Sequence, residues 1–324
     1  MQAMVATHWG EPADMQIQDL PDPLPGPGQV CIDVHAAACN FFDILMVQGK
    51  YQVRPPLPFA PGGEVAGVVR SVGTGVSDVR PGDRVFAFLG WGGFASVACA
   101  PAASVFRMPE SMSFEHGAAF GIVYQTSYFG LVYRANLQPG ETLLVHAAAG
   151  GVGLAAVQIG RALGARVLAT AGSPEKLAVA CQHGAAEAYS YRDPGWVEQV
   201  KAATNGRGAD VIYDPVGGDV FDLSLKCIAF GGRLLVIGFA SGTIPTVSAN
   251  RILLKNIAVV GLHWGAYRQH DPARIPAAMR ALFALYEREA VQPVISATYP
   301  LRDTARALAD IAGRQSIGKV LLIP

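Results

Sequence analysis

Residues 143–153 contain an apolar run, then a turn of small residues, then the start of a pattern typical of a helix. Against the dinucleotide-binding pattern G-x-G-x-x-G, Ala148 replaces the first glycine, while Gly150 and Gly153 match the second and third. Small residues let a pyrophosphate approach the backbone, and the N–H groups of a helix N-terminus point at the anion. Tight helix–strand packing would also explain the glycines, but the strand–turn–helix context favours a dinucleotide site. The predicted contacts are Ala149, Gly150, Gly151, Val152 and Gly153.

The end of the next predicted strand indicates which dinucleotide binds. An NAD site usually carries an acidic residue about 20 residues after the glycines, where it holds the ribose 2′-hydroxyl. Here the strand ends at residues 170–173 without a carboxylate, and Glu175 comes later, inside a helix and beside Lys176. A neutral strand end with a nearby cation suits a 2′-phosphate, which favours NADPH. Because Lys176 could also be an ordinary solvated lysine, the missing acid carries more of this argument.

The elements that must position this turn follow from the hydrophobic pattern. Before residue 114, short alternating or apolar runs separated by Pro and Gly predict a small β-sandwich or a partly open barrel. Residues 114–119 and 122–133 predict two helices. Strands and helices then alternate from 142 to 262, which predicts an α/β fold with a doubly wound parallel sheet. The tail contains predicted helices at 272–289 and 302–312 and a final strand at 319–323.

Composition excludes several classes of function. Lys plus Arg and Asp plus Glu both number 25, so a formal net charge of zero predicts no binding to nucleic acid or an anionic membrane through the overall field. Five cysteines without a CxxC pair suggest neither a disulfide framework nor a zinc ribbon. The first residues lack the basic and apolar regions of a signal peptide, so we expect a cytoplasmic protein.

The whole chain resembles the medium-chain dehydrogenase/reductase superfamily, specifically its zinc-free quinone oxidoreductase branch. The resemblance rests on motifs whose order and spacing match along nearly all of the chain, at residues 40–43, 62–69, 81–85, 147–153, 214–218 and 321–324. It implies a β-rich GroES-like substrate domain from residues 1–120 and 261–324. A Rossmann domain, residues 121–260, would be inserted between these two parts.

The resemblance also implies a site without metal. The positions that hold the catalytic zinc in related alcohol dehydrogenases are Asn40, Gly63 and Ile122 in this chain. The four-cysteine lobe that binds a structural zinc is also missing. Cys39 lies next to Asn40, but one thiol is a poor zinc site, because zinc takes three or four clustered nitrogen and sulfur ligands.

Matched position by position, the family implies further cofactor contacts. Asn40 and Thr126 would line the nicotinamide pocket. Residues around the 2′-phosphate would be Gly172, Ser173, Lys176, Tyr191 and, from the tail, Arg314. Phe239 is a further predicted cofactor contact. Arg314 could instead be a surface ion-pair partner.

Tyr51 matches a cleft tyrosine and is the candidate catalytic residue, although it could be a packing aromatic. A second tyrosine common in the family is Leu45 here.

Together these features predict an NADPH-dependent enzyme that transfers hydride to a quinone or an α,β-unsaturated carbonyl. The alternatives are an enoyl-thioester reductase of the same superfamily and a non-enzymatic, crystallin-like NADPH-binding protein. The resemblance also implies a homodimer that pairs through residues 257–262.

Overall fold

The chain folds into two units in the computed structural model, which describes residues 1–324. Unit 1 contains Met1–Ile122 and Pro293–Pro324, and unit 2 contains Val123–Gln292. The sequence placed these divisions after residues 120 and 260. The second differs because the segment after residue 260 packs within unit 2: the buried Gln125 donates from Nε2 to the Ile275 carbonyl at 3.1 Å.

Unit 2 is built on a six-stranded sheet in the order β10-β9-β8-β11-β12-β13, and all its strand pairs are parallel. The strands are β8 (Thr142–Val145), β9 (Arg166–Ala171), β10 (Glu187–Ser190), β11 (Ala209–Asp214), β12 (Ile228–Val236) and β13 (Ala258–Gly261). They are rich in buried Val, Leu and Ile, as expected for strands covered on both faces. This sheet confirms the α/β fold class.

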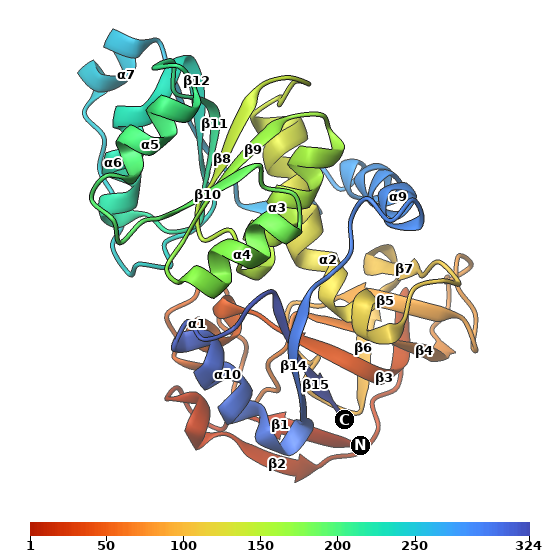
Figure 1. Cartoon of the computed structure of the whole chain (residues 1–324). Helices are drawn as coiled ribbons and strands as arrows, with labels where there is room; N and C mark the ends of the chain where they lie inside the picture. Colours follow the sequence, from red (N-terminus) through yellow and green to blue (C-terminus); the bar gives the residue numbers. More distant parts are fainter. The chain divides into compact units, whose positions relative to one another are not determined.

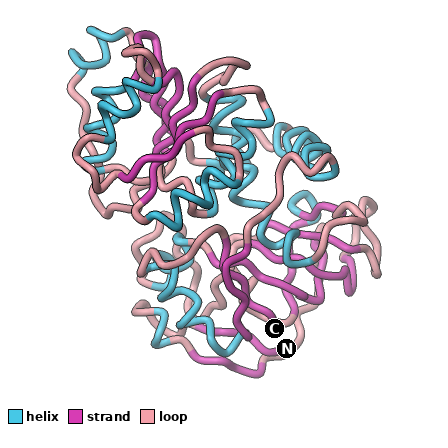
Figure 2. The backbone as a smooth tube through the Cα atoms, in the orientation of Figure 1, coloured by secondary structure: helices cyan, strands magenta, loops and turns pink.

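Helices cover both faces of this sheet. Those of unit 2 are α3 (Gly151–Ala162), α4 (Pro174–Gln182), α5 (Trp196–Ala203), α6 (Gly218–Cys227), α7 (Ala249–Lys255), α8 (Tyr267–His270), α9 (Arg274–Glu287) and the short η4 (Trp264–Ala266). Helices α3 and α4 lie on one face and α5 and α6 on the other (Figure 1). Figure 2 shows the strands of the sheet enclosed between them. From β8 the chain builds the sheet in one direction, through β9 and β10, and then returns to add β11 on the other side of β8. The strand order therefore reverses between β8 and β11, at their carboxyl ends. Ligands of open α/β sheets bind at such a point.

Unit 1 is a mainly antiparallel β-structure. Its larger sheet has the order β14-β15-β3-β4-β5-β7, with β6 also paired to β3. The strands are β1 (Gln2–Val5), β2 (Gln16–Asp19), β3 (Gln29–Cys39), β4 (Glu64–Val72), β5 (Arg84–Phe88), β6 (Val97–Pro101), β7 (Val105–Arg107), β14 (Ile295–Pro300) and β15 (Lys319–Ile323). The helices are α1 (Phe41–Val47), α10 (Thr304–Ala312) and the short η1 (Pro12–Asp14), η2 (Ala102–Ser104) and η5 (Leu301–Asp303). Strand β15 pairs with β3, so the last residues of the chain complete a sheet begun by the first forty.

The two helices predicted between residues 114 and 133 are one continuous helix, α2 (Phe114–Tyr128), followed by a π-helical segment, η3 (Phe129–Arg134). Residues 120 and 121, which separated the two predicted helices, lie inside α2. A Cβ on Gly121 would stand 2.7 Å from the Phe88 ring and 3.0 Å from Glu64 Oε2. The glycine therefore serves close packing rather than helix termination.

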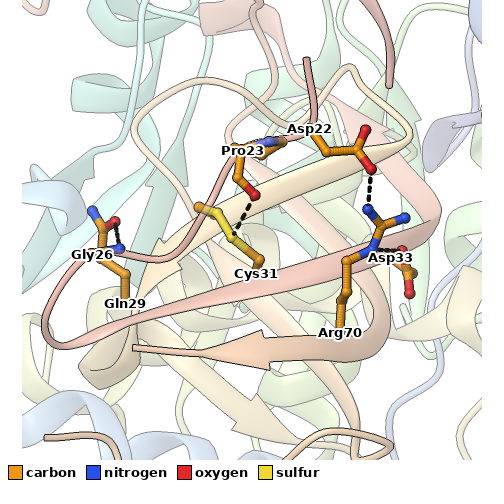
Figure 3. Close-up of a disulfide and its surroundings, with 8 residues drawn as sticks. Asp22, Pro23, Gly26, Gln29, Cys31, Asp33 and Arg70 are labelled. Atoms are coloured by element: carbon orange, nitrogen blue, oxygen red, sulfur yellow. Dashed lines mark hydrogen bonds and ion pairs between the residues drawn. A yellow bond between two sulfur atoms is a disulfide. The ribbon is translucent and has the colours of Figure 1, made fainter. Parts of the chain in front are cut away.

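Two cysteines whose spacing in the chain suggested no pairing form a disulfide. Cys31 and Cys99 lie directly opposite each other on the antiparallel strands β3 and β6, with their Cα atoms 4.1 Å apart. Figure 3 shows this bond, with Arg70 on the same sheet between the carboxylates of Asp22 and Asp33. The expectation of no disulfide was wrong because strand register, not sequence spacing, brings the two thiols together. No helix of the chain combines the length and apolar character needed to span a bilayer.

Candidate functional site

The small-residue turn follows β8 and leads into α3, as predicted. Gly150 is the N-cap of α3, with φ −80° and ψ 170°. The turn is tied to its neighbours, because Ala148 N–H donates to the Thr170 carbonyl at 3.0 Å and Gly150 N–H to the Ala147 carbonyl at 2.9 Å. The first N–H groups of α3 have no carbonyl partner within the helix and carry its positive dipole end, which makes this position suitable for an anion.

Gly150 and Gly153 lack side chains for different reasons. A Cβ on Gly153 would stand 2.3 Å from the Ala147 carbonyl oxygen and 2.8 Å from Ala148 Cα, so this glycine lets α3 pack against the turn. A Cβ on Gly150 would meet only the Ala147 oxygen, at 3.4 Å. Protein packing does not require a glycine at position 150. The glycine leaves the backbone open at this point.

A buried histidine fixes the base of the turn. His146 is fully buried, with Nδ1 2.7 Å from Thr170 Oγ1 and Nε2 2.8 Å from Ser224 Oγ. The Ser224 hydroxyl donates to the Val220 carbonyl at 2.6 Å, so His146 must donate from Nε2 and accept at Nδ1. Burial lowers the pKa of His146 to about 4, which keeps the ring neutral at physiological pH. The histidine therefore connects β8, β9 and α6 beneath the turn and is not a free base.

The end of β9 places four of the predicted phosphate contacts together. Ser173 is the N-cap of α4, and its hydroxyl accepts from Lys176 N–H at 3.4 Å. A Cβ on Gly172 would stand 2.9 Å from the Tyr191 hydroxyl, so the phenol covers the glycine. Lys176 has a lowered pKa, mainly because it is partly buried, and also because Arg192 lies nearby.

Arg192 is a cation that sequence reasoning missed. It follows Tyr191 immediately after β10, and β10 pairs with β9 so that Ser190 lies opposite Ala171. Lys176 lies in the first turn of α4, just after β9, so Lys176 and Arg192 both follow the same edge of the sheet. The signal in the sequence was a basic residue just after the strand that became β10. Only the pairing of β10 with β9 shows that this residue follows the same edge of the sheet as Lys176.

Helix α2 also meets the turn. Ser127 donates from its hydroxyl to the Val152 carbonyl at 2.9 Å and lies 3.0 Å from the Tyr213 hydroxyl. This contact, which the sequence did not indicate, holds the helical turn that carries Thr126 against the start of α3. Phe239 follows β12 at the same edge of the sheet and is partly exposed, with its ring 3.1 Å from the place a Cβ would take on Gly217.

Unit 1 contains a second group of predicted site residues around a buried ion pair. Lys319, at the start of β15, donates from Nζ to Glu64 Oε1 at 2.9 Å, to Asn40 Oδ1 at 2.6 Å and to the Cys39 carbonyl at 3.1 Å. Asn40 is the N-cap of α1, and its backbone N–H donates to Asp43 Oδ2 at 2.7 Å. Burial raises the pKa of the Asp43 carboxyl to about 7.

The positions that match the family's zinc ligands come together but do not fit a zinc ion. A Cβ on Gly63 would stand 2.5 Å from the Phe42 ring and 3.4 Å from Ile122 Cδ1, so apolar atoms fill the space of a histidine. Asn40 is held by a lysine, and an ammonium group repels a metal cation. No cluster of three or more His, Cys, Asp or Glu side chains is arranged to hold a metal. The donor set is unsuitable for zinc, which takes several nitrogen, sulfur or carboxylate ligands.

Tyr51 packs against the first turn of α1, the helix that Asn40 caps. Its ring stacks on Phe42 with centroids 5.4 Å apart. Burial, together with the nearby Asp43 carboxylate, raises the pKa of the Tyr51 phenol, so it carries its proton at neutral pH and can donate a hydrogen bond. Arg314 lies in unit 1 just after α10, with a left-handed backbone at φ 56°. Its predicted role at the 2′-phosphate stays a prediction.

Comparisons with known proteins agree with this arrangement. Residues 26–110 match the family described as alcohol dehydrogenase GroES-like domain. Residues 151–284 match the family described as zinc-binding dehydrogenase, although the donor set above does not fit zinc.

Individual relatives match nearly the whole chain. The quinone oxidoreductase-like protein 2 homolog of Nematostella vectensis is 42% identical over 300 residues, covering 92% of this chain and 82% of that protein. The structure of Escherichia coli quinone oxidoreductase complexed with NADPH has a TM-score of 0.93 at 32% identity and covers both chains completely. An NAD-dependent alcohol dehydrogenase has a TM-score of 0.90 at 30% identity, also over both full chains. The shared fold therefore leaves the choice of cofactor and substrate to the residues of each site.

Proposed function

Because the chain belongs to the quinone oxidoreductase branch of the medium-chain dehydrogenase/reductase superfamily, we propose that it uses NADPH to reduce a quinone or an α,β-unsaturated carbonyl. The observation that supports the cofactor choice is the end of β9, where residues 170–173 have no carboxylate and where Lys176 and Arg192 both follow the same edge of the sheet. A 2′-phosphate needs cations and hydroxyl donors there, whereas a free ribose needs an acid.

The residues present fit the dinucleotide. The open backbone at Gly150 and the first N–H groups of α3 would hold the pyrophosphate. Ser173, Lys176, Tyr191 and Arg192 would hold the 2′-phosphate, with Arg314 reaching it from the tail. When bound, NADPH supplies a hydride. Asn40, Thr126 and Phe239 would position its nicotinamide part, and the chain's own task would be to orient that ring and exclude water.

The residues around Tyr51 support this acceptor class. A conjugated carbonyl is already electrophilic, so its reduction needs no Lewis acid, which agrees with a donor set that does not fit zinc. The protonated Tyr51 phenol would donate a hydrogen bond to the oxygen on which negative charge develops. Oxidation of a simple alcohol runs in the opposite direction and in related enzymes relies on a metal that stabilises the alkoxide.

Cofactor kinetics test the proposal. The wild type should prefer NADPH to NADH in kcat/KM. Lys176→Ala and Arg192→Ala should each raise KM for NADPH about tenfold or more, because each removes a charge-assisted contact worth about 1.5–3 kcal/mol. NADH kinetics should change little. Lys226→Ala, at the opposite edge of the sheet where β12 begins, is the matched control. A preference for NADH, or unchanged NADPH kinetics in both variants, would refute the cofactor assignment.

An acceptor screen separates the proposal from its alternatives. NADPH oxidation should be measured with quinones, alkenals and enoyl thioesters, each with and without a chelator. Turnover restricted to enoyl thioesters would indicate the thioester reductase, and tight NADPH binding without turnover would indicate a crystallin-like protein. Loss of activity with chelator would contradict the metal-free mechanism.

The same proposal includes a homodimer in the cytoplasm. Strand β13 is an edge of the sheet, and the neighbouring α7 exposes Leu253 and Leu254 by 75% and 74% of their surface. An unpaired edge beside exposed leucines is suited to pairing with a second copy of the chain.

A further inference from the structure

A buried ammonium group holds the Asn40 side chain in one orientation. The Lys319 side chain is 5% exposed, and its Nζ has three protons. These go to the Cys39 carbonyl at 3.1 Å, to Asn40 Oδ1 at 2.6 Å and to Glu64 Oε1 at 2.9 Å. Every donor of Lys319 therefore has a partner, and one of the three is the side-chain oxygen of Asn40.

The amide nitrogen of Asn40 is equally committed. Nδ2 donates to Glu64 Oε1 at 3.0 Å and to the Ala38 carbonyl at 3.3 Å, which uses both of its protons. Turning the amide over would place NH₂ against the ammonium of Lys319 and the oxygen against the carboxylate of Glu64. Both new contacts would be repulsive and buried, so the two charges determine which end of the amide faces which way.

These hydrogen bonds limit what Asn40 can offer a ligand. Its two N–H donors are used inside the protein, and its oxygen, which has two lone pairs, uses one on Lys319. Asn40 is 8% exposed, and among the polar atoms of its side chain only Oδ1 has acceptor capacity beyond the bonds named here. Toward a cofactor, Asn40 is therefore an acceptor only.

We propose that Lys319 is a positioning residue that turns Asn40 into a hydrogen-bond acceptor for the carboxamide N–H of the nicotinamide ring, and so makes the site selective for that carboxamide. This inference rests on the proposed function, in which Asn40 lines the nicotinamide pocket. An acetyl group in place of the carboxamide has a carbonyl but no N–H, so it cannot make this bond.

The proposal also explains a charged group where related enzymes hold a metal. Lys319 acts from β15, 279 positions after Asn40 in the sequence, and joins the end of β3 to the start of α1. A neutral residue at position 319 could pack the same sheet, because buried ion pairs are often replaceable by apolar residues without loss of stability. A charge is required if its purpose is to orient the amide.

The test compares NADPH with its 3-acetylpyridine analogue, using dissociation constants from calorimetry. Wild type should bind NADPH about three- to tenfold more tightly, the fold-change expected from one hydrogen bond. In the double variant Lys319→Met/Glu64→Gln, which removes both members of the ion pair, this ratio should fall toward one. Glu64→Gln alone keeps Lys319 against Asn40 Oδ1 and should keep the ratio. Lys226→Met, a lysine in the other unit, should also keep it.

Each outcome decides the matter. An unchanged ratio in the folded double variant would overturn the positioning role of Lys319, and so would loss of the ratio in Glu64→Gln alone. The second variant also decides the case if the double variant does not fold. Equal affinities in wild type would show that Asn40 does not select the carboxamide. Failure of wild type to bind NADPH at all would instead refute the proposed function, on which this inference depends.

Discussion

Gly150 and Gly153 lie three residues apart in the small-residue turn before α3. An alanine substitution should nevertheless lower stability at Gly153 and cofactor affinity at Gly150. In Gly153→Ala, the new Cβ would stand 2.3 Å from the Ala147 oxygen and 2.8 Å from Ala148 Cα, and neither backbone atom can rotate away. Overpacking costs about 1–3 kcal/mol, with a value near the upper end expected against backbone. The higher helix propensity of alanine returns at most about 1 kcal/mol. The free energy of unfolding should therefore fall by about 2 kcal/mol, which lowers Tm by about 4–8 °C.

In Gly150→Ala, the Cβ meets only the Ala147 oxygen, at 3.4 Å, and φ −80° with ψ 170° is allowed for alanine. The poorer N-cap costs a few tenths of a kcal/mol, and the stiffer unfolded chain returns about as much. The free energy of unfolding should stay within about 0.5 kcal/mol of wild type. Affinity for NADPH should nevertheless fall at least about tenfold, because the methyl group would project from backbone that the pyrophosphate must approach.

Urea unfolding of the two variants measures the stability difference, and calorimetric titration of NADPH into Gly150→Ala measures the binding loss. Each variant is the control for the other, since both add one methyl group to the same turn. Equal destabilisation of the two proteins would show that the packing argument is wrong. Full NADPH affinity in a stable Gly150→Ala would show that the turn does not hold the phosphate.

Further predictions concern pH, assembly and the cysteines. In the folded protein the pKa of His146 is lowered to about 4, so the unfolded chain binds a proton at this histidine more tightly. Acidification from pH 6.5 to 4 should therefore lower the free energy of unfolding by up to about 3 kcal/mol. The pKa of Asp43 is raised to about 7 in the folded protein, so protonation of this carboxyl raises the free energy of unfolding as the pH falls over the same range. Asp43→Asn should therefore be more acid-sensitive than wild type in urea unfolding, and identical pH slopes would contradict this. Leu253→Glu should sediment as a monomer if wild type is a dimer; a dimeric variant would argue against pairing beside α7. Alkylation of denatured, unreduced protein should block three thiols, and all five after reduction, because Cys31 and Cys99 are bonded; five blocked thiols without reduction would contradict the pairing.

Local sequence patterns were enough to predict the parts of the site that depend on neighbours along the chain. The apolar run, the small-residue turn and the following helix pattern identified the turn at Gly150 and Gly153. The absence of an acid at the end of β9 favoured NADPH, and the alternation of strands and helices predicted the parallel sheet. These features can be predicted because a turn's conformation and a helix N-terminus depend on residues only a few positions apart.

The tertiary structure alone decided what distant segments do together. The structure shows that Lys319 donates to the Asn40 amide oxygen, that Arg192 and Lys176 follow the same edge of the sheet, that Ser127 bonds to the start of α3, and that Cys31 faces Cys99. It also shows that one helix continues through residues 120 and 121, which separated the two predicted helices. Each of these depends on strand pairing or close packing between residues far apart in the chain. A local pattern carries no information on register or on the atoms across a packed interface, so only the folded chain could reveal them.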